Sequence, residues 1–251
     1  MLAQDARKIA DLLLEARWRR MPLAPAEDLP APASAADAYT IQRLVSGELG
    51  PVAAWKVGAA SPEAEPGMAP IHLVHASPAS LPAAGYHRLG VEVEIAYRIG
   101  RDLPARDEPW TREEVAAAID AVMPAIEVVD TRLAAPLDGE PFWKLADFQL
   151  NGGLVVGAPR ADWRAVDPLT QPVRLVIDGV TVAEGRGGNP AGDLMRLVTW
   201  LAGSAGRVFG GLRRGQIVTT GSLTGLRWVE PGARIGALLD GLGEVSVEFP
   251  G

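Results

Sequence analysis

Apolar residues recur at helical spacing near the start of the chain and at alternating spacing through most of the rest. A helix over residues 5–20 is predicted by the stripe Ile9, Leu12, Leu13 and Ala16. Prolines then favour an extended linker over residues 22–32. Ser34 and Asp37 have the spacing of a helix N-terminal cap, which predicts a second helix from Ser34 to Leu49.

Alternating apolar residues predict several strands in the rest of the chain. The expected strands lie within residues 55–58, 90–97, 125–129, 153–157, 216–220 and 232–249. Residues 173–183 are predicted to form a hairpin, because Asp178-Gly179 is a dipeptide that suits a two-residue turn.

Two further helices and one long loop are expected between these strands. A capping-box pattern predicts a helix over residues 111–123. Asn189-Pro190 has the character of a helix start and predicts a helix over residues 189–207. Residues 61–89 are rich in Pro, Ala and His without a sustained period, and we interpret them as a loop that could form a substrate wall.

These elements describe an α+β chain that is mainly β, with a helical N-terminal portion (residues 1–52) and a β-rich domain (residues 53–251). The net charge of −7, without a long Lys/Arg run, argues against a nucleic-acid partner. The chain has no cysteine, which excludes disulfides, thiolate metal sites and a catalytic thiol. No apolar run has membrane-spanning length and the N-terminus lacks a signal-peptide core, so we expect a cytoplasmic protein without a membrane partner.

Two carboxylates lie within the strand predicted over residues 90–97. Side chains alternate faces along a strand, so Glu92 and Glu94 project from the same face. Adjacent carboxylates repel each other, and a hard cation such as Mg²⁺, Mn²⁺ or Ca²⁺ relieves this repulsion through oxygen ligands. The alternative interpretation is the solvated face of an amphipathic strand.

A third acid, Glu127, lies in a short apolar run downstream. Ala125 and Val129 share its face of the predicted strand, so the carboxylate lies among residues that favour burial. A buried carboxylate is rarely left unpaired, and a metal-ligand role and a buried salt bridge are both consistent with this position. Asp130 and Arg132 are expected to pair with each other at the end of the segment.

Several basic residues are candidates for proton transfer. Lys56 follows Trp55 in an apolar setting, where desolvation would lower its pKa and suit it to acid–base chemistry; the alternative is a lysine that snorkels from a strand edge. Lys144 is a second candidate or an ion-pair partner for an acid. His72 and His75, in the expected loop, could each supply a general base or be simply solvated.

Two glycine-rich segments could contact an anion. Residues 184–188 precede the helix predicted at Asn189 but match no phosphate-binding pattern, so we expect a tight turn there. Residues 216–225 run from a strand into a turn rich in hydroxyl groups, which include those of Thr220 and Ser222. Such a turn can bind a carboxylate, and a plain polar turn is equally consistent with it.

Five segments, in order along the chain, carry a resemblance to a known family. They are Trp55-Lys-Val-Gly58, Glu92-Val-Glu-Ile-Ala-Tyr97 with Gly100-Arg-Asp-Leu-Pro104, Ala125-Ile-Glu-Val-Val-Asp-Thr-Arg132, Leu145-Ala-Asp147 with Asn151-Gly-Gly153, and Gly215-Gln-Ile-Val-Thr-Thr-Gly-Ser222. Together they resemble the 2-keto-4-pentenoate hydratase and 4-oxalocrotonate decarboxylase branch of the fumarylacetoacetate hydrolase superfamily. The resemblance covers nearly the whole chain, although residues 66–72 and 147–152 depart from the family's pattern.

The resemblance implies a mixed β-sandwich roll that holds one Mg²⁺ or Mn²⁺. Carried over, the metal ligands are Glu92, Glu94 and Glu127, and the catalytic lysine is Lys56. His72 is the candidate general base. Substrate contacts are expected from Gly58, Lys144, Asp147, Asn151, Thr220 and Ser222.

The function that this resemblance implies is a metal-dependent lyase, either a hydratase or a decarboxylase. Its substrates would be 2-oxo or 2-hydroxydienoic acids from the catabolism of aromatic compounds. One alternative is an acylpyruvate C–C hydrolase in which His72 activates water, and another is a non-catalytic metal-binding paralogue that assembles with an enzyme partner. A homo-oligomer, either a dimer or a ring of dimers, is also expected.

Overall fold

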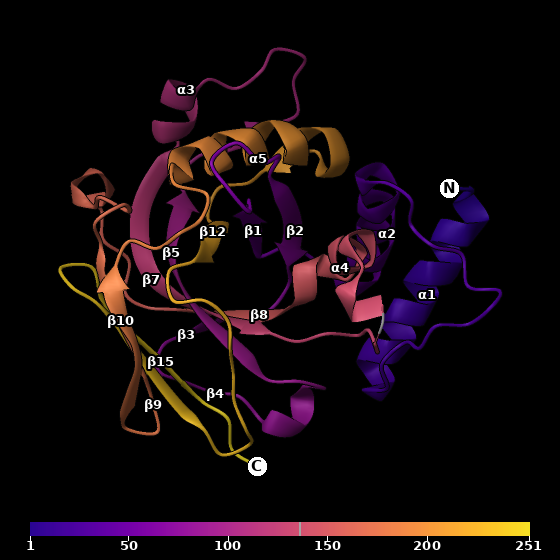
Figure 1. Cartoon of the computed structure of the whole chain (residues 1–251). Coiled ribbons are helices and arrows are strands. Elements are labelled where there is room, and N and C mark those ends of the chain that lie inside the picture. The colour runs from indigo at the N-terminus through magenta and orange to yellow at the C-terminus, as the bar shows by residue number, and fades with distance from the viewer. Residues whose placement is uncertain (136) are drawn as a thin grey trace.

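The computed structural model contains two large β-sheets, a long helix across one of them and a group of helices at the N-terminal side (Figure 1). It describes residues 1–135 and 137–251. The α-helices are α1 (Ala3–Arg19), α2 (Ala35–Leu49), α3 (Arg112–Ala116), α4 (Pro141–Ala146) and α5 (Leu194–Phe209), and short 3₁₀ helices cover Ala83–Gly85, Leu137–Gly139, Phe148–Leu150 and Trp163–Ala165.

The larger sheet has eight strands, in the order β2-β1-β12-β5-β7-β8-β3, with β13 beside β5. Its strands are β1 (Ala54–Gly58), β2 (Gly67–Ile71), β3 (Val74–Ala76), β5 (Gly90–Ile99), β7 (Ile119–Val129), β8 (Asn151–Val156), β12 (Ile217–Ser222) and β13 (Arg227–Trp228). Because β2 also contacts β8, the sheet curls into a roll. Its inner face buries mostly small residues, which let the walls approach each other: Ala54, Ile71, Ala96, Ala121, Met123, Ala125 and Leu154.

The second sheet has five strands, in the order β10-β9-β14-β15-β4. They are β4 (Ala79–Ser80), β9 (Pro172–Ile177), β10 (Val180–Arg186), β14 (Arg234–Leu239) and β15 (Gly243–Glu248), while β6 (Leu103–Pro104) and β11 (Gly211–Leu212) form a separate pair. The main core lies between this sheet, α5 and the outer face of the roll, where alternate residues of β5 such as Val91, Val93 and Ile95 are fully buried. Because side chains alternate along a strand, Glu92 and Glu94 lie on the opposite face of β5.

The predicted hairpin and N-terminal helices are confirmed. Asp178 and Gly179 both have positive φ angles, 50° and 81°, as a two-residue hairpin turn requires. Ser34 caps α2 by accepting a hydrogen bond from the Asp37 backbone N–H at 3.2 Å. The predicted α+β class, with more sheet than helix, is likewise confirmed.

Two predicted helices have different bounds in the structure. The capping box at Thr111 is present, but α3 ends at Ala116, and the residues that follow pair with β5 from Ile119 onward as strand β7. Helix α5 is capped by Asp193 rather than by Asn189. Gly192 has a φ of 67°, a left-handed conformation that separates Asn189 from the helix.

The expected loop over residues 61–89 contains three short strands. Strand β2 pairs antiparallel with β1, β3 pairs parallel with β8, and β4 pairs with β15. These strands are held by partners far along the chain, so local composition gives little sign of them. The expectation of an unstructured segment was therefore wrong.

Helices α1 and α2 share a buried cluster with residues of the β-rich part of the chain. Leu13 and Ile41 from these helices pack with Leu133, Trp143 and Phe148. The two portions therefore share a core. The division of the chain at residue 52 remains a prediction. Among the described residues, no helix has both the length and the apolarity to cross a membrane.

Candidate metal centre

Three carboxylates converge on the inner face of the roll. Glu92 and Glu94 lie on β5, and Glu127 lies on β7 directly opposite Glu92 in the antiparallel register. One carboxylate oxygen from each residue lies within 4.8 Å of the others. Glu94 and Glu127 are almost completely buried, with exposed fractions of 1% and 0%, whereas Glu92 is half-buried. The sequence therefore predicted this grouping correctly.

The electrostatics of this acidic cluster are unfavourable unless positive charge is present. Burial, followed by the charges of Glu127 and Glu92, raises the pKa of Glu94 well above its ordinary value. Burial and the charge of Glu127 also raise the pKa of Glu92. Within the described part of the chain, Glu127 Oε2 is buried without a hydrogen-bond partner. An orphaned buried oxygen among three acids fits a hard cation with oxygen ligands.

Lys56, on β1, supplies one positive charge to the acidic cluster. Its Nζ donates hydrogen bonds to Glu127 Oε1 at 2.7 Å and to the Gln149 carbonyl at 3.0 Å. Three ionised carboxylates and this ammonium leave a formal charge of −2, which one divalent cation would cancel. The residues present therefore fit a divalent ion.

The prediction of a lowered pKa for Lys56 was wrong. Burial by itself lowers the pKa of the ammonium, but the charges of Glu127, Glu92 and Glu94 outweigh burial and raise it. The sequence shows the apolar neighbours of this lysine along β1. It does not show that carboxylates from two other strands face it.

Several donors fix the orientation of the carboxylates. Asn151 Nδ2 donates to Glu127 Oε1 at 2.9 Å, and the Gly221 backbone N–H donates to Glu94 Oε2 at 2.7 Å. The Thr219 hydroxyl donates to the same oxygen of Glu94. A contact from Ser222 partly offsets the rise in the pKa of Glu92. Sequence reasoning missed Thr219 and Gly221, because only the pairing of β12 with β5 brings them to Glu94.

Among the residues predicted to contact substrate, the structure brings Asn151 and Ser222 to the acidic cluster. Gly58 ends β1 two residues after Lys56 and pairs with Gly67. Thr220 is fully buried, and its hydroxyl donates to the Ile95 carbonyl at 2.8 Å, so it contacts the backbone of β5 rather than an acid.

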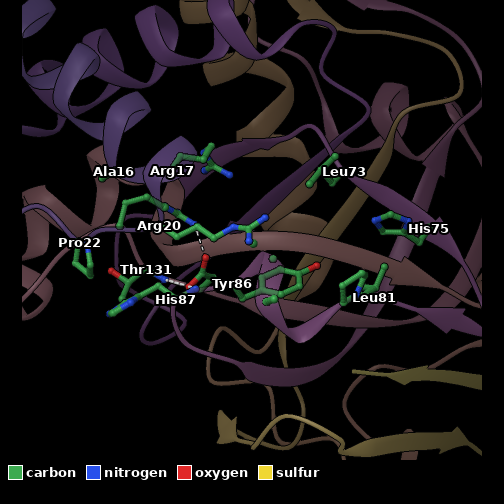
Figure 2. Close-up of a pocket in the computed structure, with 16 residues that line it drawn as sticks. Ala16, Arg17, Arg20, Pro22, Leu73, His75, Leu81, Tyr86, His87 and Thr131 are labelled. Carbon is green, nitrogen blue, oxygen red and sulfur yellow. Dashed lines mark hydrogen bonds and ion pairs between the residues drawn. The ribbon is translucent and has the colours of Figure 1, made fainter. Parts of the chain in front are cut away.

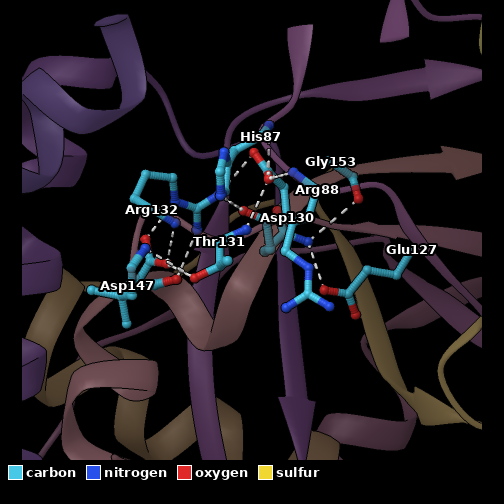
Figure 3. A network of polar contacts seen from close by, with 10 residues as sticks. His87, Arg88, Glu127, Asp130, Thr131, Arg132, Asp147 and Gly153 are labelled. Carbon is cyan, nitrogen blue, oxygen red and sulfur yellow. Dashed lines mark hydrogen bonds and ion pairs between the residues drawn. The ribbon is translucent and has the colours of Figure 1, made fainter. Parts of the chain in front are cut away.

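Two other predicted contacts lie apart from the acids. Asp147 is buried and accepts from Arg132 Nε at 2.5 Å and from the Arg132 backbone N–H at 2.9 Å (Figure 3). The expected contact between Arg132 and Asp130 is longer, at 3.7 Å. Lys144 lies half-buried on α4, and no ion pair joins it to another described residue. A substrate role for Asp147 would have to disrupt its buried ion pair.

His72 is held by the helical N-terminal portion of the chain. Its Nε2 lies 3.1 Å from the Ser46 hydroxyl, its Nδ1 lies 3.2 Å from the Pro51 carbonyl, and its ring stacks on that of Phe148 at 5.8 Å. Both ring nitrogens are thus occupied away from the acids, so the expected role as a general base does not fit this placement. His75 lies on β3, at a separate cavity.

A buried polar chain runs from Asp147 to the acidic cluster, as part of the network in Figure 3. Arg132 connects Asp147 to Asn151, because its Nη1 donates to the Asn151 carbonyl at 2.9 Å. The side chain of Asn151 then continues to Glu127. Asn151 therefore links Glu127 to the buried ion pair of Arg132 and Asp147.

The family model described as Fumarylacetoacetate (FAA) hydrolase C-terminal matches residues 54–249. The chain belongs to the fumarylacetoacetate hydrolase family. The matched range includes β5, β7 and every residue of the acidic cluster. The family membership predicted from the sequence motifs is confirmed.

Named relatives within this family are enzymes. The chain is 28% identical over 270 residues to a 2-keto-4-pentenoate hydratase of Paraburkholderia xenovorans (strain LB400), covering 99% of this chain and 96% of the relative. It is 30% identical over 176 residues to a 2-hydroxyhexa-2,4-dienoate hydratase of Comamonas testosteroni, covering 68% and 63%. The solved structure of 4-oxalocrotonate decarboxylase from Pseudomonas putida G7, complexed with magnesium and adipate, superposes with a TM-score of 0.85 at 23% identity, covering 99% of this chain and 98% of that one, which confirms the fold.

We expect Glu92→Gln to remove most of the rise in Tm that saturating Mg²⁺ or Mn²⁺ produces. A cation that binds only the native state stabilises it by about 2.7 kcal/mol at 100 times its Kd, and the substitution removes one charged ligand. Scanning calorimetry with and without the cation measures this. Glu244→Gln is the matched control, because Glu244 is exposed on β15. Equal metal-dependent shifts in the two variants would contradict the assignment.

In EDTA, thermal stability is expected to fall as the pH rises above the ordinary glutamate pKa of about 4.3. The raised pKa values of Glu92 and Glu94 mean that the native state retains protons that the unfolded chain has already lost, so stability declines until the pH passes the raised values. A cation replaces these protons, and the stabilisation by Mg²⁺ should therefore grow over the same interval. Tm measured across that interval checks this, and Glu94→Gln should flatten the trend.

Proposed function

We propose that this protein is a divalent-metal-dependent lyase, a hydratase or decarboxylase, that acts on 2-oxo or 2-hydroxydienoic acids from the catabolism of aromatic compounds. The observation that carries the proposal is the convergence of Glu92, Glu94, Glu127 and Lys56 in a chain similar along its whole length to a 2-keto-4-pentenoate hydratase. Hydratase and decarboxylase names among the relatives support the reaction class.

The proposed cofactor is Mg²⁺, with Mn²⁺ as a substitute. Solved structures of the same fold are complexes with calcium, magnesium or manganese, which supports a divalent ion of this kind. Glu92, Glu94 and Glu127 would hold it, and three protein ligands leave further coordination positions for a small substrate. A cation held there supplies a Lewis acid that stabilises the enolate form of a 2-oxo acid.

Lys56 is the group that we assign to proton transfer. Its Nζ is held between Glu127 and the Gln149 carbonyl, so the ammonium has a fixed direction toward the acidic cluster. An ammonium held there is placed to donate a proton to a carbon of a dienol substrate, but the carboxylates by themselves raise its pKa and therefore hold the proton more tightly. When the carboxylates share their charge with a cation, they hold this proton less tightly.

The residues around the carboxylates keep the site rigid. Asn151 holds Glu127, while Thr219 and Gly221 hold Glu94, so two of the three proposed ligands are already oriented. Such outer contacts commonly set the affinity and geometry of a metal site. Ser222, beside half-buried Glu92, lies on the more accessible side of the cluster and is our candidate for a substrate contact.

The alternative of an acylpyruvate C–C hydrolase has less support. In that interpretation His72 activates water, but its ring nitrogens contact Ser46 and the Pro51 carbonyl. A non-catalytic paralogue is also less well supported, since the three acids cluster and Lys56 pairs with one of them, Glu127. We further propose a homo-oligomer in the cytoplasm; Val180 and Val182, exposed on the edge strand β10, offer an apolar surface for pairing of copies.

A substrate panel tests the proposed function. The full chain with Mg²⁺ is supplied with 2-hydroxypenta-2,4-dienoate, 4-oxalocrotonate and an acylpyruvate, and products are identified by mass spectrometry. We expect turnover of the dienoate or of 4-oxalocrotonate, loss of turnover in EDTA and recovery on addition of Mg²⁺ or Mn²⁺. Cleavage of the acylpyruvate alone would establish the hydrolase instead, and no turnover of any member would overturn the proposal.

Lys56→Met is expected to lower kcat by ~10²-fold or more, the scale for loss of a positioned acid or base. The rise in Tm with Mg²⁺ should persist, because the three carboxylates remain. Lys8→Met is the control, since Lys8 is exposed on α1 and pairs with Asp28. A raised KM with nearly unchanged kcat would instead show that Lys56 binds substrate without transferring a proton.

A further inference from the structure

A separate cavity of about 550 Å³ lies beside the C-terminal end of α1 (Figure 2). Its walls come from α1, from β3, from the segment before β5 and from the residues that follow β7. None of the three clustered acids lines it, and neither does Lys56. Cavities of this size commonly hold small molecules.

The cavity has a cationic side and an apolar side. Arg17, on α1, and Arg20, the residue that caps the C-terminal end of α1, line the cationic side, and Figure 2 shows them across from Leu73 and Leu81. Pro82 and Tyr86 extend the apolar side. A molecule that fits both sides has one anionic end and an apolar body.

Arg17 has no ion-pair partner among the described residues. Within the described part of the chain it has no carboxylate within 4.0 Å and no hydrogen-bond acceptor, and its guanidinium lies 5.7 Å from the centroid of the Phe148 ring. Burial, and then the charge of Arg132, lower the pKa of Arg17 to about 9, although the charges of Asp147 and Asp130 partly oppose this change. A partly buried cation without a partner costs free energy that a bound anion recovers.

The one acid that lines the cavity is already engaged. Asp130 Oδ1 accepts hydrogen bonds from the backbone N–H groups of His87, Arg88 and Thr131, at 3.1, 2.9 and 2.9 Å. Its other oxygen lies 3.7 Å from Arg132. Asp130 is therefore committed to the local backbone and to Arg132, which leaves Arg17 for a ligand.

We propose that this cavity binds a small organic carboxylate, whose carboxylate group pairs with Arg17 and whose apolar body packs against Leu73, Leu81 and Tyr86. A guanidinium can donate two parallel hydrogen bonds to a carboxylate. An inorganic anion would leave the apolar side uncovered. The inference goes beyond the proposed reaction, because it does not require a metal or turnover.

Isothermal titration calorimetry of the full chain in EDTA tests the inference, with hexanoate as the probe. EDTA removes the divalent cation, so binding cannot arise from a carboxylate that coordinates it. We expect hexanoate to bind the natural protein and the Glu92→Gln variant equally, and neutral hexanamide and inorganic phosphate to bind at least about tenfold more weakly. Equal binding of hexanamide, or no binding of hexanoate, would overturn the proposal.

Arg17→Met should weaken hexanoate binding by about tenfold or more, the effect of losing a charge-assisted hydrogen bond of about 1.5 kcal/mol. Its Tm without ligand should not fall, because the substitution removes an unpaired charge. Arg19→Met is the matched control, since Arg19 is exposed on the same helix and pairs with Glu15. Arg17→Lys, which keeps the charge without the planar fork, should be intermediate. Unchanged hexanoate binding in Arg17→Met would refute the site.

Steady-state kinetics of Arg17→Met distinguish two sources of the carboxylate. If the cavity binds the substrate of the proposed reaction, KM rises while kcat is retained; if it binds a different metabolite, both constants stay unchanged. The kinetics identify the source of the carboxylate. Calorimetry alone tests whether the cavity binds one. Failure of the substrate panel would leave the calorimetric result standing, so the two proposals can fail separately.

Discussion

Repulsion among three clustered carboxylates, two of them buried and one half-buried, is the interaction on which the rest of the site depends. Glu92, Glu94 and Glu127 approach one another on the inner face of the roll, and Lys56 offsets only one of their charges. Burial makes each uncompensated charge costly, as the raised pKa values of Glu92 and Glu94 indicate. A fold that keeps such a cluster is arranged for a ligand of opposite charge.

The roll provides this arrangement because its inner face is narrow and rigid. Alanines such as Ala96 and Ala125 let the strands close around a small interior, while apolar residues on the other face of β5 anchor it to the main core. The antiparallel register of β5 and β7 sets Glu127 directly opposite Glu92. Donors from neighbouring strands then orient Glu94 and Glu127, so the positions of these two carboxylates depend on backbone pairing.

A single polar chain connects the carboxylates with the second cavity. Arg132 pairs with Asp147 and donates to Asn151, which in turn holds Glu127, while Thr131 and Arg132 also line the cavity beside Arg17. The two sites carry opposite charges, so the acidic cluster favours a cation and Arg17 favours an anion.

The sequence by itself determined the amphipathic elements and the placement of two acids on one strand face. The helices α1 and α2, the hairpin at Asp178-Gly179 and the common face of Glu92 and Glu94 follow from local periodicity and turn chemistry. The tertiary structure alone decided the strands hidden in residues 61–89, the roles of Thr219 and Gly221, and the placement of His72 beside Ser46. These features arise from contacts between residues distant in sequence, where strand register and long-range packing override local propensity.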